Sequence, residues 1–95
     1  MKSLPWHNFV QAQIAKSVEL RSQMLDGAFE CMAEGDVEAG LIMLHDVVKA
    51  EMGFAELARR TGLNEKSLHR ALSPKGNPTV RTVIRVRKAL VENMG

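Results

Sequence analysis

Apolar residues recur along the first third of the chain at the three-to-four-residue spacing of a helix that buries one face. The members of this pattern are Val10, Ile14, Val18, Leu25, Phe29 and Met32. Lys16 and Ser17 stand where the pattern can break, so residues 5–33 form either two short helices, with Ser17 as the second N-cap, or one long helix. Gly35 and Asp36 then end the pattern, because glycine suits the left-handed position after a helix and aspartate caps the next one.

Four more helices are predicted in the rest of the chain. They cover roughly residues 37–52, 54–60, 64–72 and 80–93. The first of them buries Leu41, Leu44, Val47 and Val48. The last carries a helical pattern of apolar residues that outweighs the strand propensity of residues 83–86, namely Val80, Val83, Ile84, Leu90 and Val91. The sequence therefore predicts an all-α fold of five or six helices.

The segment from Gly53 to Leu72 has the residue types that a tight crossing of two short helices needs. Ala58 is small where the second helix passes close to the first, and Gly62, four residues later, suits a turn with positive φ. Asn64 is a good N-cap for the second helix. The inward side consists of Leu57, Leu63, Leu68 and Leu72. The spacing predicts a helix-turn-helix motif, with Ala58, Gly62, Leu63 and Leu68 as its structural residues.

The outer side of the second helix supplies the candidate residues for reading DNA bases. They are Glu65, Lys66, Ser67, His69 and Arg70. In the major groove, Lys66 and Arg70 would donate to guanine, Ser67 would bond either kind of group, and Glu65 would accept from cytosine. The same five residues also fit an ordinary solvated helix surface, and the pattern leaves that alternative open.

The loop after this helix supplies candidate contacts to the DNA backbone. It stops the helix at Pro74, turns at Gly76 and restarts a helix with Pro78 or Thr79 near the first position. The candidate phosphate contacts are Lys75, Asn77, Thr79 and Arg81, together with the free amides of the new helix. In the alternative interpretation, the loop is only a connector whose prolines set its direction.

The distribution of charge adds an argument for a polyanionic partner. The 95 residues are 45% hydrophobic and 25% charged, with a net charge of only +2. Residues 1–52 hold four Lys or Arg against eight Asp or Glu, a net charge of −4, whereas residues 53–95 hold nine against three, a net charge of +6. An acidic half joined to a basic half favours duplex DNA as the partner of the second half.

Other classes of function have little support in the sequence. His7, His45 and His69 are far apart and have no cysteine at ligand spacing, so we expect no metal site. We also expect no catalytic residue, no cofactor and no small-molecule ligand. Cys31 is the only cysteine and fits core packing in a reducing compartment. No apolar stretch is long enough to span a membrane and residues 1–6 hold no signal core, so we expect a cytoplasmic protein.

The motif and the loop after it resemble a known family. Residues 56–63 (Glu-Leu-Ala-Arg-Arg-Thr-Gly-Leu) and residues 72–78 (Leu-Ser-Pro-Lys-Gly-Asn-Pro) resemble the HigA-like, Xre-type addiction-module antidote proteins. The resemblance extends to residues 6–9 (Trp-His-Asn-Phe) and to the turn at residues 33–36, and so covers nearly the whole chain. It implies a lambda-repressor-like helix-turn-helix domain in an antitoxin that neutralises a RelE/ParE-like toxin and represses their shared operon as a dimer.

Two positions depart from the pattern of that family. Ala55 stands where the family usually has a Ser or Thr that caps the first helix of the motif, and alanine cannot accept from the backbone. Near residues 16–18 the family often has an Asp-Pro break, which this chain lacks, so the first two helices can merge. The second departure leaves the toxin-facing surface open.

Taken together, these features predict one domain over residues 1–95, with a helical extension at residues 1–36 and a helix-turn-helix core at residues 37–95. We expect a sequence-specific, DNA-binding antitoxin that acts as a homodimer on half-sites about 10 bp apart. Two alternatives remain, a stand-alone helix-turn-helix transcriptional regulator and a helical adaptor that binds only protein.

Overall fold

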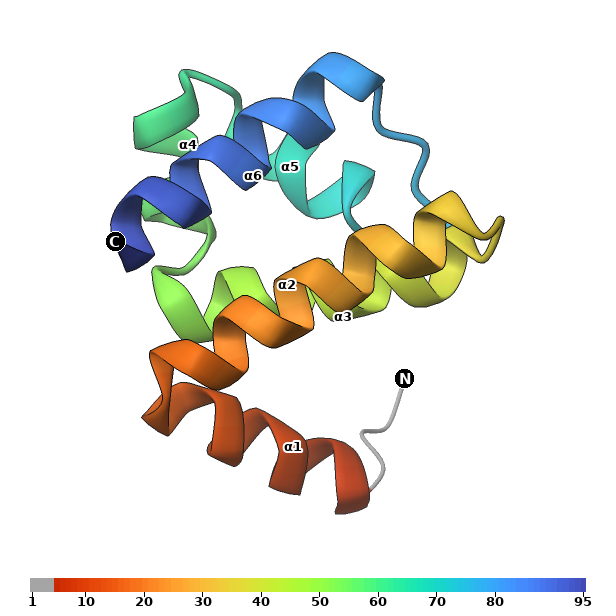
Figure 1. Ribbon diagram of the computed structural model, residues 1–95. Coiled ribbons are helices and arrows are strands. Elements are labelled where there is room, and N and C mark those ends of the chain that lie inside the picture. The colour runs from red at the N-terminus through yellow and green to blue at the C-terminus, as the bar shows by residue number, and fades with distance from the viewer. Residues whose placement is uncertain (1–4) are drawn as a thin grey trace.

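The computed structural model describes residues 5–95, with side-chain surroundings from residue 8 onward. Two earlier expectations concern side chains outside this described part: the absence of a signal core in residues 1–6, and the family resemblance at Trp6 and His7. Residues 5–95 form six helices and no strand: α1 Pro5–Lys16, α2 Val18–Ala33, α3 Val37–Glu51, α4 Phe54–Thr61, α5 Glu65–Ala71 and α6 Val80–Met94 (Figure 1). The prediction of an all-α fold with five or six helices is confirmed, and the described residues form six. None of the helices in the described range is both long enough and apolar enough to cross a membrane.

The first helix boundaries are fixed by short-range capping. The Ser17 hydroxyl accepts from the Leu20 amide at 3.2 Å and starts α2, so residues 5–33 form two helices. Gly35, with φ of 98°, and Asp36 separate α2 from α3. The Asp36 carboxylate accepts from the Ala39 amide at 3.2 Å. The predicted roles of these three residues are confirmed.

α2 and α3 lie side by side and form the most extensive helix pair of the described chain (Figure 1). Gly40 on α3 allows this approach, because an added Cβ would lie 2.5 Å from Met32 Cγ and 2.7 Å from the Ala28 carbonyl oxygen. Cys31 is half-buried nearby and directs its thiol toward Met43 Sδ at 3.8 Å. Small residues and flexible sulfur-containing side chains thus fill a narrow space between the two helices.

One apolar cluster joins α2 to all the helices that follow it. Its fully buried side chains come from α2, from α3 as predicted, and from α4 to α6 with the cap of α5: Leu25, Leu41, Leu44, Val47, Val48, Leu57, Leu68, Leu72, Val86 and Leu90. On α6 the buried side passes through Val86, Ala89 and Leu90, so most of the apolar pattern seen in the sequence does not face the core. Val80, Ile84 and Val91 remain exposed.

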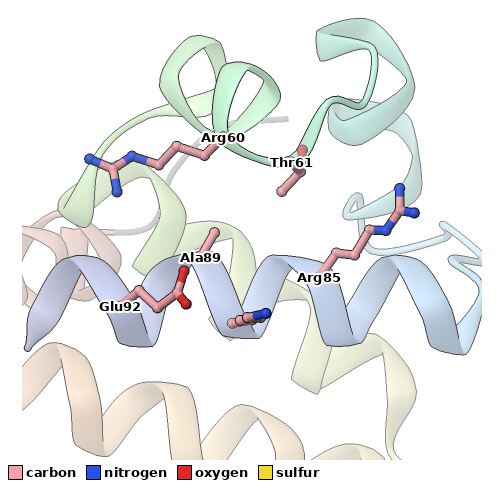
Figure 2. A pocket seen from close by; sticks show the side chains of 6 residues that line it. Arg60, Thr61, Arg85, Ala89 and Glu92 are labelled. Carbon is pink, nitrogen blue, oxygen red and sulfur yellow. The ribbon is translucent and has the colours of Figure 1, made fainter.

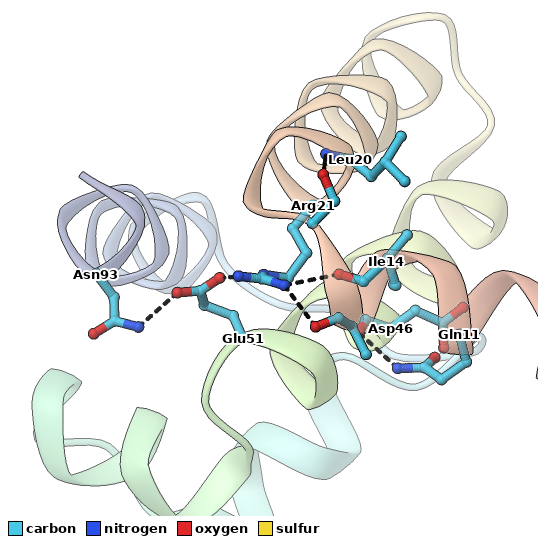
Figure 3. A network of polar contacts seen from close by, with 9 residues as sticks. Gln11, Ile14, Leu20, Arg21, Asp46, Glu51 and Asn93 are labelled. Atoms are coloured by element: carbon cyan, nitrogen blue, oxygen red, sulfur yellow. Dashed lines mark hydrogen bonds and ion pairs between the residues drawn. The ribbon is translucent and has the colours of Figure 1, made fainter.

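A network of polar contacts fastens the ends of α1, α3 and α6 to α2 (Figure 3). Arg21 Nε lies 2.5 Å from Glu51 Oε1, and the side chain of Glu51 is only 5% exposed. Arg21 Nη1 also donates to the Ile14 carbonyl at 2.8 Å, at the end of α1. Asn93 on α6 donates to the other Glu51 oxygen at 2.6 Å. A single carboxylate therefore binds groups from two other helices.

Candidate nucleic-acid interface

α4 and α5 are joined by a short turn with the predicted local geometry. Gly62 adopts φ of 74° and its amide donates to the Ala58 carbonyl at 2.9 Å, which ends α4. The Thr61 hydroxyl donates to the Leu57 carbonyl at 2.8 Å. Asn64 then starts α5, because its side-chain oxygen accepts from the Ser67 amide at 3.0 Å. The predictions for Gly62 and Asn64 are confirmed.

The inward side of this helix pair also agrees with the sequence pattern. Leu57, Leu68 and Leu72 are fully buried, and Ala58 and Leu63 are partly buried against the same cluster. Burial of the leucines fixes the rotation of α5 about its axis, since a helix of seven residues has little other means of orientation. The opposite side of α5 must then face solvent.

The start of α4 differs from the expectation drawn from the family pattern. The helix begins at Phe54 and its cap position falls on Gly53, two residues before Ala55. Gly53 has φ of 84°, makes no side-chain cap, and its amide closes α3 on the Val48 carbonyl at 2.7 Å. Ala55 therefore lies in the first turn. The inference that α4 lacks a side-chain cap is confirmed, although the cap residue was placed wrongly.

All five candidate base-reading residues are exposed on α5. Because each residue advances about 100° around a helix, Lys66 and Arg70 lie one turn apart and almost opposite the buried Leu68. Within residues 5–95, neither cation makes an ion pair with a carboxylate. These two side chains are thus free to donate to a group outside the chain.

His69 lies at the edge of this surface and its ring is directed toward α4. The imidazole stacks on Phe54 with centroids 3.9 Å apart, and His45 of α3 lies 4.9 Å from the same Phe54 ring. This stack fixes the start of α4 against the last turn of α5. The sequence pattern did not predict this contact. The available signal was Phe54, an aromatic residue at the first position of α4.

The loop of residues 72–79 packs tightly against the end of α5. A Cβ at Gly76 would lie 2.0 Å from the Ala71 carbonyl oxygen, so only glycine fits there without movement of the backbone. The Ser73 hydroxyl donates to the Arg70 carbonyl at 2.8 Å, and the Gly76 amide donates to the Ser73 carbonyl at 2.8 Å. The Ser-Pro-Lys-Gly string therefore closes the C-terminus of α5.

The four candidate phosphate contacts in and after this loop are exposed: Lys75, Asn77, Thr79 and Arg81. Thr79 has a structural role as well, because its hydroxyl accepts from the Thr82 amide at 3.1 Å and caps α6. Pro78 precedes the cap, and Val80 is the first helical residue. Of the two residues proposed for the start of this helix, Thr79 is the one at the cap.

Not every cation of the basic half is equally free. Glu56 accepts from Arg59 and also lies 2.8 Å from Arg60 Nε. Hydrogen bonds from Arg59 and then Arg60 lower the pKa of the Glu56 carboxyl from its usual 4.5 to about 2, and Glu56 in turn raises the pKa of Arg59. The outer cations of α4 are therefore partly neutralised, in contrast to those of α5.

A shallow pocket of about 390 Å³ lies between the end of α4 and α6 (Figure 2). Its lining residues are Arg60, Thr61, Arg85, Lys88, Ala89 and Glu92. Arg87, on the neighbouring side of α6, instead reaches α2, with its guanidinium 5.5 Å from the Phe29 ring centroid and 3.8 Å from Asp26. Arg87 is therefore directed toward α2, whereas Arg85 and Lys88 border the pocket.

Comparison with known proteins gives the family of the chain. Residues 8–95 match the family model described as "Probable addiction module antidote protein", so the chain belongs to this family. An uncharacterized protein of Haemophilus influenzae is 39% identical over 61 residues, which cover 64% of this chain and 62% of that relative. The match thus spans less than two thirds of the relative's length. No solved structure gives a significant match.

The resemblance to addiction-module antidotes is thereby confirmed at the level of the family. The narrower HigA-like, Xre-type group remains a prediction. The match covers every helix from α2 onward, and so includes α4, α5 and the loop that follows them.

Proposed function

We propose that this protein is the antidote of a toxin–antidote pair and that it binds operator DNA through α4, α5 and the loop of residues 72–79. Membership of the antidote family supports the first part. The arrangement of the two short helices supports the second, in the form of a lambda-repressor-like, Xre-type helix-turn-helix. The toxin is of the RelE/ParE-like kind, and binding to the shared operon represses it.

The observation that carries the DNA-binding proposal is the position of Lys66 and Arg70. Both are exposed, lie one turn apart opposite Leu68, and are free of carboxylates within residues 5–95. Their helix is held by the Asn64 cap, the Gly62 turn and the loop at Gly76. Cations on a short, fixed helix match what major-groove recognition of guanine requires.

The other candidate residues take roles that follow from their places. Glu65 and Ser67 flank Lys66 and read neighbouring bases, with His69 at the margin of the contact. Lys75, Asn77, Thr79 and Arg81 hold phosphates, which gives affinity without sequence information. Because one such domain makes few base contacts, a homodimer on half-sites about 10 bp apart supplies the operator affinity.

DNA binding is tested with duplexes from the region upstream of the protein's own gene, by fluorescence anisotropy over a series of salt concentrations. Arg70→Ala should weaken binding by about 1–3 kcal/mol and relax the preference at one base position. Lys75→Ala should weaken all sequences alike and reduce the slope of log affinity against log salt by about one. Lys49→Ala is the matched control, since Lys49 is an exposed cation on α3 in the acidic half.

The outcome that contradicts the assignment is equally specific. If Arg70→Ala and Lys75→Ala bind with unchanged affinity and salt slope, α5 and its loop do not form the DNA interface. If the wild-type protein fails to bind any duplex even at low salt, the helical adaptor becomes the better interpretation.

The antidote role is tested by co-expression with each reading frame adjacent to the gene. A toxin partner should arrest growth when expressed alone, should be harmless with this protein, and should co-purify with it. Sequence-specific DNA binding without such a partner would instead indicate a stand-alone transcriptional regulator.

A further inference from the structure

The outer side of α6 carries apolar residues that no other part of residues 5–95 covers. Val80, Ile84 and Val91 are 76%, 59% and 44% exposed. Beside them on the same helix, Arg85, Lys88 and Glu92 are exposed and make no ion pair within the described chain. Figure 2 shows Arg85 and Glu92 on α6, on the side that borders the pocket.

The spacing of these residues makes the outer face of α6 complementary to the same face of a second copy. Consider two copies of α6 that run antiparallel and are related by a two-fold axis at Lys88. Ile84 precedes Lys88 by four residues and Val91 follows it by three, so each isoleucine lies at the level of the partner's valine, to within about one residue rise of 1.5 Å. The same axis places each Arg85 at the level of the partner's Glu92.

The two pairings also fall on matching flanks. At about 100° per residue, Ile84 and Val91 lie within a narrow strip on one flank of the outward face, and Arg85 and Glu92 lie together on the other flank. A two-fold axis perpendicular to two antiparallel helices brings each flank against the same flank of its partner. Apolar residues therefore meet apolar residues, and each arginine meets a glutamate.

We propose that the outer face of α6 is the surface through which two copies of this chain associate, with Ile84 against Val91 and Arg85 against Glu92 of the partner. The proposal gives a surface to the homodimer proposed above, and it does not depend on DNA binding. Charge complementarity favours a second copy, because Arg85 and Glu92 are two turns apart on one helix and reach one another only between molecules.

Lys88 sets a limit on the strength of this interface. Two lysines meet near the axis, and their mutual repulsion opposes association. One helix pair also buries less than the roughly 800 Å² per partner of a standard interface. We therefore expect a reversible, concentration-dependent dimer, which Lys88→Leu strengthens.

The test is sedimentation equilibrium of the full chain without DNA. Arg85→Glu and Glu92→Arg each replace two attractive pairs by repulsive ones and should weaken the dimer by about tenfold. The double variant Arg85→Glu/Glu92→Arg restores opposite charges across the axis and should recover the wild-type association constant. Ile84→Asp should leave a monomer, and Lys49→Glu, at an exposed cation on α3 instead of α6, serves as the charge-change control. Circular dichroism checks that each variant is folded.

Four results would overturn the proposal: a wild-type protein that stays monomeric, a folded Ile84→Asp variant that still dimerises, single charge variants that associate like the wild type, or a double variant that fails to recover. DNA binding measured in parallel separates the two proposals. If the double variant does not recover association while operator binding is intact, only the proposed α6 interface is refuted. If the double variant recovers association but the protein binds no duplex, only the proposed DNA-binding function is refuted.

Discussion

The helices α1–α3 and the pair α4–α5 are built on different principles. α2 and α3 form the most extensive helix pair of the described residues, with Gly40 close to the Ala28 carbonyl and the nearly buried Glu51 carboxylate paired with Arg21. α4 and α5 are short helices of eight and seven residues. Three fully buried leucines and the stack of His69 on Phe54 hold them in place, and their cationic side chains are exposed. We infer that changes in the packing of α1–α3 lower the stability of the fold. Changes on the surface of α4 and α5 should leave the stability nearly unchanged and weaken the proposed DNA binding instead.

The largest effect is expected from the ion pair in the first part. Arg21→Met leaves the nearly buried Glu51 carboxylate without its cation and should lower the free energy of unfolding by about 3 kcal/mol in urea denaturation. Asn93→Ala, which removes only a hydrogen bond to the same carboxylate, should cost less. The double variant Arg21→Met/Glu51→Met should be more stable than Arg21→Met alone. A single variant as stable as the wild type would show that the pair is not a structural anchor.

A second test compares two glycines of the α2–α3 contact. Gly40→Ala forces a methyl group against the Ala28 carbonyl and Met32, and should destabilise the fold by about 1–3 kcal/mol. Gly27→Ala meets only the terminal methyl of Met43, which can move, so the gain in helix propensity should leave it neutral or up to about 1 kcal/mol more stable. Thermal denaturation measures both. Equal effects would mean that backbone contact does not limit this interface.

A smaller effect is expected at the cap of α5. Asn64→Ala removes the acceptor for the Ser67 amide and should cost about 1 kcal/mol of stability. Because α5 carries Lys66 and Arg70, DNA affinity should fall by more than the loss of global stability explains. Asn64→Ser keeps an acceptor and is the matched control. If Asn64→Ala and Asn64→Ser bind DNA equally well, the cap does not position the helix.

The smallest effect is expected from Glu56, a surface carboxylate whose side chain is 32% exposed. Its pKa is lower in the folded protein, about 2, than its usual 4.5, so its contribution to stability is present above pH 4.5 and is lost as pH falls toward 2. Glu56→Gln should therefore flatten the dependence of melting temperature on pH in this range, and added salt should reduce the difference. Parallel curves for the two proteins at low salt would contradict the assignment.

Most helix boundaries could be predicted because their signals are local. Ser17, Asp36 and Asn64 cap helices through amides three residues away, and Gly35 and Gly62 adopt positive φ where the apolar pattern stops. The exposure of Lys66 and Arg70 could likewise be predicted, since it follows from the burial of Leu68 on the same short helix.

Contacts between distant residues could not be predicted in this way. Arg21 and Glu51 are 30 residues apart, and Glu51 and Asn93 are 42 apart, so no periodicity connects them. On α6, apolar residues occupy more of the helix circumference than the core covers, and only the packing of neighbouring helices selects Val86 over Ile84. The stack of His69 on Phe54 depends on the crossing of α4 and α5 in the same manner.

The Glu51 carboxylate has a consequence for how the molecule opens. Through Arg21 and Asn93 it connects the C-terminal end of α1 with the last turn of α6. Loss of Asn93 from its site leaves Arg21 as the remaining partner of Glu51 in the network, so loosening of the last turn of α6 weakens the attachment of the end of α1. In native-state hydrogen exchange, the amides at the two ends should therefore exchange as one cooperative unit.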